Sequence, residues 1–349
     1  MNFASDNVYG VHPAIMAALE TANRDVTHKS YGYDDLTKRA EAELAKVFGC
    51  ELRMFCVATG TAANGLALSA LVPPYGAVFC HGEAHIAVDE CNSPELFTGG
   101  AKIIGLHSAN GKITAAQVEK AIGGFNKGEH DPKPSAISIT VTTELGTVYS
   151  AEEVKALSAL ARSRGMKLHM DGARFANAVA GLGCTPADLT WKAGVDALSF
   201  GATKNGAMFL EAVVFFDLKA AEDFTYRRMR GGQLFSKSRY QAAQMLAYLE
   251  DGLWLKLAGH ANAMAARLAQ GLMKCNSVRI PLPVNANEVF AVLPRKLNDK
   301  LQAMGAVYYD WSPDCLGPDG LADDEVFARF VLSFATDAKD VDALVSAAG

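Results

Sequence analysis

The sequence lacks the features that mark several large classes of protein. Its seven cysteines are odd in number and form no C-x-x-C pair, so neither a disulfide framework nor a metal site is predicted. A net charge of -5 gives no basic field to hold nucleic acid or an anionic membrane, and neither partner is expected. The N-terminus shows no basic segment followed by an apolar one, so a secretory signal is not expected. We therefore predict a cytoplasmic location.

Long hydrophobic runs and the dinucleotide fingerprint are also missing. The most apolar stretch, Ala207 to Phe216, is interrupted by Glu211 and is too short to span a bilayer, so we interpret it as a buried strand. No G-x-G-x-x-G follows the first predicted strand, which argues against an NAD-type oxidoreductase. With 50% hydrophobic and 20% charged residues, the composition is that of an ordinary globular protein.

The first two thirds of the chain alternate helical segments with short β-branched runs. This pattern is typical of βαβ units and predicts an α/β fold around a mostly parallel sheet of seven strands. The predicted strands are Met54–Val57, Ala77–Cys80, Lys102–Gly105, Ala136–Thr142, Lys167–Met170, Asp196–Phe200 and Ala212–Phe216. Helices are predicted at Thr61–Leu71, Ala115–Ile122 and Ala151–Arg164.

The last third predicts a smaller α+β part. Residues Gln241–Met273 have few breakers and are predicted to be mostly helix. Strands at Glu288–Leu293 and Phe327–Phe334 then alternate with helices at Lys296–Met304 and Ala338–Ala347. We therefore predict two domains: 1–245, an N-terminal arm with a large domain, and 246–349, a small C-terminal domain.

Three segments place polar groups just after predicted strands, where ligands of open α/β sheets bind. In the segment 57–64, Gly60 permits a tight turn and Thr61 opens a helix whose free N–H groups suit a phosphate. The second segment, 168–174, carries Asp171 and Arg174. The third segment, 199–206, carries Lys204 among small residues. Singly, these are an ordinary capped turn, a helix cap and a surface lysine.

Taken together, the three segments match the needs of an aldehyde cofactor that carries a phosphate and a pyridine ring. The phosphate needs N–H donors, the aldehyde an amine, and the ring nitrogen a carboxylate. Gly60 and Thr61, then Lys204 and Asp171, supply these functions at the ends of predicted strands. The sequence therefore predicts a site for pyridoxal 5'-phosphate.

These residues resemble the threonine aldolases, which belong to the fold type I pyridoxal-phosphate enzymes of the aspartate aminotransferase superfamily. The resemblance runs from Ser5-Asp6 and Tyr31-Gly32 to the segment 328–333, and its most specific element is His-Met-Asp-Gly-Ala-Arg with Lys204 following 33 positions after the Asp. It implies a fold type I large domain with a small C-terminal domain. It also implies a homo-oligomer, a dimer of dimers, whose sites are shared across the dimer interface.

The resemblance assigns roles to individual residues. Lys204, His85 and Asp171 are the implied catalytic residues, and the implied cofactor-binding residues are Gly60, Thr61, His85, Asp171, Arg174, Thr203 and Lys204. The implied substrate-binding residues, two of them arginines suited to a carboxylate, are Ser5, Tyr31, Glu90, Arg174 and Arg329. From the sequence alone, His85 also fits a core histidine, Arg329 a solvated edge strand, and Ser5 a disordered arm.

Two segments bear on the roles of further residues. Many threonine aldolases carry a second active-site histidine in a segment like Glu-Asn-Thr-His-Asn-Gly, whereas the stretch 143–148 here reads Thr-Glu-Leu-Gly-Thr-Val. The preference at Cβ is therefore left open. The Met229–Lys237 loop resembles one that reaches a neighbouring subunit, where Arg230 and Lys237 assist the phosphate or simply form solvated charges.

The resemblance implies aldol cleavage of L-threonine, L-allo-threonine or phenylserine to glycine and an aldehyde. Our hypothesis from the sequence is that His85 removes the β-hydroxyl proton, directly or through a water. The sequence does not separate threonine from phenylserine. The alternatives are a β-eliminating lyase or an aminotransferase on the same fold, and, from another class, an inactive relative that serves as a binding module; a binding module has no need of Lys204.

Overall fold

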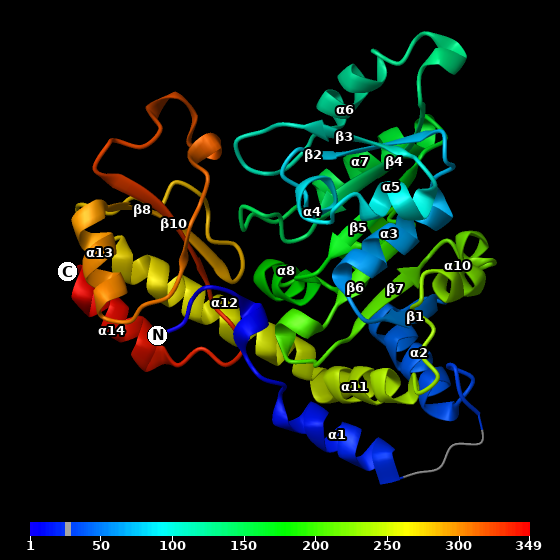
Figure 1. Cartoon of the computed structure of the whole chain (residues 1–349), viewed down its shortest axis with the longest axis horizontal. Coiled ribbons are helices and arrows are strands. Elements are labelled where there is room, and N and C mark those ends of the chain that lie inside the picture. Colours follow the sequence, from blue (N-terminus) through cyan, green and yellow to red (C-terminus); the bar gives the residue numbers. More distant parts are fainter. Residues whose placement is uncertain (25–28) are drawn as a thin grey trace.

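The computed structural model describes residues 1–24 and 29–349 (Figure 1). Its larger part is built on a seven-stranded sheet with the order β1-β7-β6-β5-β4-β2-β3. The strands are β1 (Arg53–Val57), β2 (Gly76–His81), β3 (Lys102–Leu106), β4 (Lys133–Thr140), β5 (Lys167–Gly172), β6 (Ala197–Gly201) and β7 (Glu211–Phe215). All seven predicted strands are confirmed, although β4 begins earlier and ends earlier than predicted.

The sheet is mostly parallel, as the alternating pattern predicts. Strands β3, β2, β4, β5 and β6 pair in parallel, whereas β7 runs antiparallel to both β6 and β1. Every residue of β7 is buried, including Glu211. The carboxyl ends of β4, β5 and β6 meet at one edge, where Asp171 stands opposite Thr140 and Ser199. The parallel arrangement thus brings the strand ends together.

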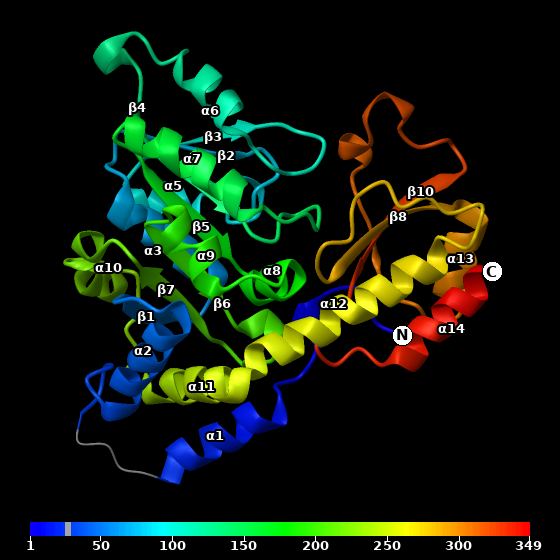
Figure 2. The same cartoon turned by 180° about the vertical axis from the view of Figure 1, so that it is seen from behind.

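Helices cover both faces of this sheet. Figure 1 shows α3 and α5 in front of the strands, and Figure 2, seen from behind, shows α7 and α9 there. The helices of this part are α1 (Pro13–Arg24), α2 (Asp35–Phe48), α3 (Gly60–Leu71), α4 (His85–Val88), α5 (Ser93–Thr98), α6 (Ala115–Ile122), α7 (Ala151–Ser163), α8 (Phe175–Leu182), α9 (Pro186–Leu189), α10 (Phe224–Arg230) and α11 (Arg239–Leu249). The three predicted helices are among them.

The smaller part carries a three-stranded antiparallel sheet with the order β8-β10-β9. Its elements are β8 (Glu288–Pro294), α13 (Arg295–Ala303), β9 (Tyr309–Asp310), β10 (Glu325–Val331) and α14 (Ala338–Ala348). The N-terminal arm joins this sheet, because Phe3 bonds through its backbone to Val307 and Val331 and is fully buried in the same core. The arm is therefore tied down and not disordered.

A long helix, α12 (Leu253–Leu272), links the two parts. Trp254 packs in the core of the large part, and Leu268 packs in the core of the small part. The predicted run of helix from Gln241 to Met273 is broken between α11 and α12, where Asp251 and Gly252 have φ of 50° and 67°. That left-handed turn at a glycine redirects the chain. A domain boundary at residues 245 and 246 stays a prediction.

Within the part of the chain that the structure describes, no helix combines the length and apolar character needed to cross a bilayer.

Candidate active site

A cavity of about 210 Å³ lies at the carboxyl ends of β4 and β5, between the two parts of the chain. It collects side chains that are far apart in the sequence. The residues predicted from the sequence that line it are Ser5, Gly60, His85, Asp171, Arg174, Lys204 and Arg329. Residues from all three strand-end segments therefore line one cavity, and their roles there stay predictions.

Lys204 lies in a short 3₁₀ helix, η4 (Thr203–Asn205), directly after β6. Among the described residues its amine forms no hydrogen bond or ion pair. Thr203 fixes this turn, because its hydroxyl accepts a hydrogen bond from the backbone N–H of Leu210 at 3.1 Å. Burial raises the pKa of the neighbouring Glu211 carboxyl to about 7, while the Lys204 charge lowers it. The amine is thus available for a carbonyl carbon.

The carboxylate of Asp171 is held in a buried polar chain. Asn64 on α3 donates from Nδ2 to Asp171 Oδ2 at 2.7 Å and to Glu90 Oε1 at 2.8 Å. Glu90 Oε1 in turn lies 2.8 Å from Nδ1 of His85. This hydrogen bond raises the pKa of His85 against the lowering effect of burial, and burial raises the pKa of Glu90. His85 is therefore a partly buried, oriented histidine and not a core one.

The start of α3 forms part of the wall of the cavity, which Gly60 and Asn64 line. Thr59 caps the helix by accepting from the N–H of Ala62 at 3.1 Å, which leaves the N–H groups of Gly60 and Thr61 for an anion. The chain passes from β1 to α3 within two residues, and Gly60, which has no positive φ, is the first residue of the helix, one position before the start predicted at Thr61. A Cβ at Gly60 would meet no protein atom within 4 Å, so the space beside this residue is open.

Two arginines approach the cavity from different parts of the chain, and each already has a carboxylate partner. Arg174 donates to both oxygens of Asp6, at 2.7 and 3.0 Å. Arg329 donates twice to Glu288 Oε1, at 3.0 and 2.6 Å, and Arg174 lies 3.8 Å from the same oxygen. Arg329 belongs to the central strand β10, so the alternative of a solvated edge strand is excluded.

The charges around Asp6 fix the protonation of this arginine cluster. Burial by itself raises the pKa of Asp6, but the charges of Arg174 and Lys204 and hydrogen bonds from Arg174 and Asn287 outweigh it, so the pKa lies below its usual value. The same carboxylate raises the pKa of Arg174 against burial. Ser5 precedes Asp6, caps the short helix η1 (Asp6–Val8) and lines the cavity. The N-terminal arm thus contributes Ser5 and Asp6 to the part of the cavity where Arg174 lies.

Four of the residues named from the sequence do not line the cavity. Glu90 acts on it through His85, and Thr203 supports the turn that carries Lys204. Thr61 follows Gly60 as the second residue of α3. Tyr31 is 47% exposed, and its backbone N–H donates to Ser236, away from the cavity. A substrate-binding role for Tyr31 therefore stays a prediction.

Sequence reasoning missed several residues of the site. Asp6, Asn64 and Glu288 are each buried, and each holds a predicted residue in place. Asn64 could have been found as the one amide side chain in a mostly apolar helix, and Glu288 as a charge at the start of a buried strand. Glu144, which lines the cavity, lies in the stretch where the expected second histidine is missing.

The residues present fit pyridoxal phosphate. The free amine of Lys204 suits its aldehyde, the buried carboxylate of Asp171 suits its ring nitrogen, and the start of α3 suits its phosphate. Three buried polar atoms at the cavity also have no hydrogen-bond partner among the described residues, namely Asn64 Oδ1, Thr142 Oγ1 and Glu144 Oε2. Buried polar atoms without partners in a concave site point to a ligand that completes them.

Comparison with known proteins agrees with this geometry. The family model described as β-eliminating lyase matches residues 2–295. The chain belongs to this family. It is also 42% identical to a low specificity L-threonine aldolase of Pseudomonas sp. (strain NCIMB 10558), with 99% of this chain and 98% of that protein covered. A low specificity L-threonine aldolase of Pseudomonas aeruginosa is 43% identical, with 97% and 94% covered.

A solved structure gives the same result for the fold. The structure of Leishmania major threonine aldolase superposes with a TM-score of 0.92 at 28% identity, and the match covers 99% of this chain and 98% of that one. The resemblance to the threonine aldolases is therefore confirmed over essentially the whole length of this β-eliminating lyase family member, and so is the fold type I architecture.

Proposed function

We propose that this chain is a pyridoxal-phosphate-dependent lyase that cleaves L-threonine and related β-hydroxy-α-amino acids to glycine and an aldehyde. The observation that carries the proposal is the meeting of Lys204, Asp171 and two arginines in one cavity. The near full-length similarity to low specificity L-threonine aldolases supports the reaction class. L-allo-threonine and phenylserine belong to the same proposed substrate class.

The residues divide the work of binding the cofactor. Bound pyridoxal phosphate supplies an electron sink for the pair released at Cα. Lys204 would hold its aldehyde carbon, and Asp171, oriented by Asn64, would keep a proton on its ring nitrogen. The first N–H groups of α3 at Gly60 and Thr61 would receive the phosphate. His85 would lie over the ring, fixed by Glu90.

The arginines would bind the substrate carboxylate. Arg174 uses two donors on Asp6, and Arg329 is held by Glu288, so both guanidinium groups are fixed before substrate arrives. Each arginine has five N–H donors, so donors remain for a second carboxylate. Ser5 adds a hydroxyl at the same wall. Fixed donors of this kind orient the substrate and so select the bond that breaks.

The experiment that tests the function combines a spectrum with a product assay. The purified protein is expected to show an absorbance band of bound cofactor that borohydride removes, and to release acetaldehyde and glycine from L-threonine. Release of pyruvate from L-serine as the main reaction would instead support a β-eliminating lyase. Conversion of the cofactor to its amine form with a keto-acid acceptor would support an aminotransferase.

We also propose that the chain works as a homo-oligomer, with dimers that pair into a tetramer. An apolar cavity of about 1040 Å³ lies beside α1, and the residues that line it include Met16, Met208 and Phe209, which are 39–45% exposed. Exposed apolar surface of this kind suits another protein surface. Light scattering at several concentrations tests the proposal, and a monomer at all of them would contradict it.

The exposed Tyr31 and the segment Met229–Lys237, which begins with the last two residues of α10, fit this assembly, because neither is among the residues that line the cavity of its own chain. In the proposed dimer they serve the site of the neighbouring subunit. A cytoplasmic location is also proposed, on the ground that all seven cysteines are unpaired, as in a reducing compartment. Microscopy of the tagged protein in its source cells tests this location.

A further inference from the structure

Glu144 is a partly buried acid at the active-site cavity, and the proposed function gives it no task. It lines the cavity together with His85 and Lys204. Its Oε1 accepts a hydrogen bond from the backbone N–H of His85 at 2.7 Å, and its Oε2 is buried without a partner among the described residues. Resting on the proposed function, we propose that Glu144 is the base that takes the proton from the β-hydroxyl group of the substrate.

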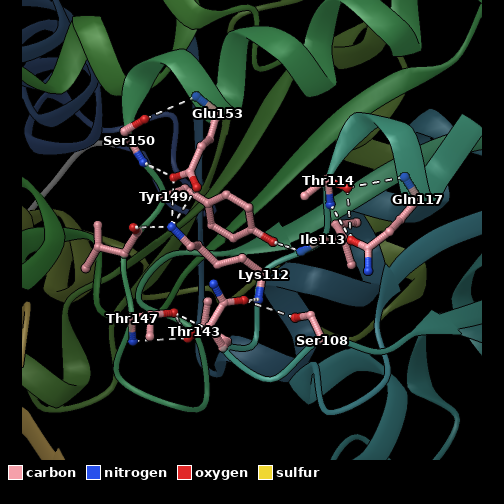
Figure 3. A network of polar contacts seen from close by, with 12 residues as sticks. Ser108, Lys112, Ile113, Thr114, Gln117, Thr143, Thr147, Tyr149, Ser150 and Glu153 are labelled. Carbon is pink, nitrogen blue, oxygen red and sulfur yellow. Dashed lines mark hydrogen bonds and ion pairs between the residues drawn. The ribbon is translucent and has the colours of Figure 1, made fainter. Parts of the chain in front are cut away.

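The turn that carries Glu144 is held rigidly. Figure 3 shows Thr143 and Thr147 bonded to each other across this turn; their hydroxyl oxygens lie 2.8 Å apart, and the backbone N–H of Thr143 donates to the carbonyl of Thr147 at 2.9 Å. Thr147 also donates to the carbonyl of Asn110 at 2.6 Å. A catalytic side chain needs such support from its surroundings.

Residues of the small part of the chain also pack against this turn. Leu145 packs in a cluster with Phe290 and Phe327. Gly146 has φ of +71°, and a Cβ there would lie 3.2 Å from the side chain of Glu288. The turn is thus wedged between the sheet and the strand β8 that carries the partner of Arg329. Glu144 is placed beside the group that binds the substrate carboxylate, and not in a mobile loop.

The electrostatics of Glu144 suit a base. Burial, with the nearby charge of Asp171, raises the pKa of Glu144 to about 7, against hydrogen bonds that include the one from His85. A general base works best when its pKa lies near the working pH. Leaving a buried acceptor unpaired is unfavourable, so a substrate hydroxyl that donates to Oε2 gains affinity as well as a route for its proton.

His85 is less suited to accept this proton. Its Nδ1 is engaged with Glu90, and that hydrogen bond raises the pKa of His85. In the imidazolium form, which a raised pKa favours, the ring has two donors and no acceptor; in the neutral form with Nδ1 donating to Glu90, Nε2 is its one acceptor. His85 therefore keeps its proposed place over the cofactor ring, while Glu144 provides the acceptor. This assignment differs from the hypothesis drawn from the sequence, which gave the base role to His85.

The proposed step balances as follows. The β-hydroxyl proton moves to Glu144 Oε2, the electron pair of the O–H bond forms the C=O bond of the departing aldehyde, and the Cα–Cβ bond breaks. Its electron pair stays with Cα, which then takes up one proton to give glycine. Glu144 releases its proton in turn, so the carboxylate is restored and threonine becomes glycine and acetaldehyde without an added reactant.

The test compares two reactions of the same holoenzyme, one that involves a β-hydroxyl group and one that does not. The first is cleavage of L-threonine. The second is exchange of the glycine α-hydrogen in D₂O, followed by NMR, which needs the cofactor and Lys204 but no base for a hydroxyl. Glu144→Gln keeps an oxygen for the N–H of His85. The matched control is Glu83→Gln, at an exposed position outside the cavity.

We expect Glu144→Gln to lower kcat for threonine by about 10²- to 10⁴-fold, the usual size of a general-base contribution. Glycine exchange and the cofactor absorbance should stay within about threefold of wild type, and Glu83→Gln should change neither reaction. Glu144→Asp, which keeps a carboxylate, should retain more threonine cleavage than Glu144→Gln. If the carboxylate had no chemical role, Glu144→Asp would cleave threonine no faster than Glu144→Gln.

A binding measurement adds a readout that does not depend on turnover. The affinities of L-serine and L-alanine, obtained by titration of the cofactor spectrum, differ through the β-hydroxyl group. A hydrogen bond to a charged partner is expected to favour serine about tenfold in wild type, and this preference should shrink in Glu144→Gln. Equal preference in both proteins would contradict contact between Glu144 and the hydroxyl.

Two outcomes of the kinetic comparison also overturn the inference. One is threonine cleavage by Glu144→Gln within about fivefold of wild type. The other is a parallel loss of threonine cleavage and glycine exchange, which marks Glu144 as a structural residue. Failure of the proposed function looks different, because the wild-type protein itself would then exchange glycine hydrogen without cleaving threonine, or do neither.

Discussion

The pair formed by Asp6 and Arg174 makes a quantitative prediction about stability. Asp6 is 3% exposed and accepts two hydrogen bonds from the guanidinium group, at 2.7 and 3.0 Å. Asp6→Asn leaves the positive charge of Arg174, which is largely buried, without its main partner. Removing one partner of a buried ion pair costs about 3–5 kcal/mol, because the remaining charge stays desolvated. The interaction also ties the N-terminal arm to the active site.

The expected change in melting temperature follows from the length of the chain. With about 2.1 cal/mol/K of unfolding entropy per residue, 349 residues give about 0.7 kcal/mol/K. A loss of about 3–5 kcal/mol then lowers Tm by about 4–7 °C. Thermal unfolding followed by circular dichroism at pH 7 measures this shift. The control is Asp35→Asn, at an exposed acid whose contact with Lys38 is a surface pair.

The direction of the pKa shift of Asp6 predicts how its contribution to stability changes with pH. Because the pKa of Asp6 is lowered in the folded chain, its contribution is complete above the pKa of the unfolded chain, about 3.9. The contribution is lost as the pH falls through the lower, folded value. The difference in Tm between wild type and Asp6→Asn should therefore be constant near neutral pH and become smaller only at acidic pH.

A double-mutant cycle checks the cause. In an Arg174→Met background, Asp6→Asn should cost much less than in wild type, since the buried charge that needed Asp6 is gone. A Tm shift below 1 °C for Asp6→Asn, or additive shifts in the cycle, would refute the reasoning that this pair is a coupled, buried unit.

Three further predictions concern the site. Asn64→Leu removes the donor shared by Asp171 and Glu90, and should lower kcat/KM about tenfold or more and raise the dissociation constant of the cofactor, measured by absorbance titration. Arg329→Lys keeps the charge but loses the planar fork, and should raise KM for threonine about tenfold with a smaller change in kcat; exposed Arg295→Lys is the control, and unchanged KM would contradict the assignment. Glu288→Gln should lower Tm by several degrees, since Arg329 loses its charged partner; an unchanged Tm would argue against that pairing.

The fold was readable because its signals are local. Alternating apolar runs and helical spacings predicted all seven strands of the large sheet, and capping residues fixed helix starts, as Ser150 and Glu153 do for α7. Boundaries were less accurate, since the end of a strand depends on its neighbours. The break at Asp251 and Gly252 was missed because helix-favouring residues surround it on both sides.

The site was only partly readable for a related reason. Asp171 lies at the end of β5, and Arg174 and Lys204 come within a few residues after β5 and β6, so chain order alone placed them at one edge of the sheet. Asp6, Asn64 and Glu288 gain their meaning only through contacts across the fold, between residues separated by 41 to 168 positions. Such pairings leave no periodic trace in a sequence. Glu144 carried a signal, as the one charged residue in the stretch 141–148, but the burial of its Oε2 is visible only in the structure.

The central claim is that Lys204 holds pyridoxal phosphate for the cleavage of threonine. The most direct measurement is borohydride reduction of the purified protein, followed by digestion and mass spectrometry of the labelled peptide. The account predicts one label per chain, on Lys204, and its absence from a folded Lys204→Ala variant that no longer releases acetaldehyde from L-threonine. A label on another lysine, or undiminished threonine cleavage by that variant, would contradict the account.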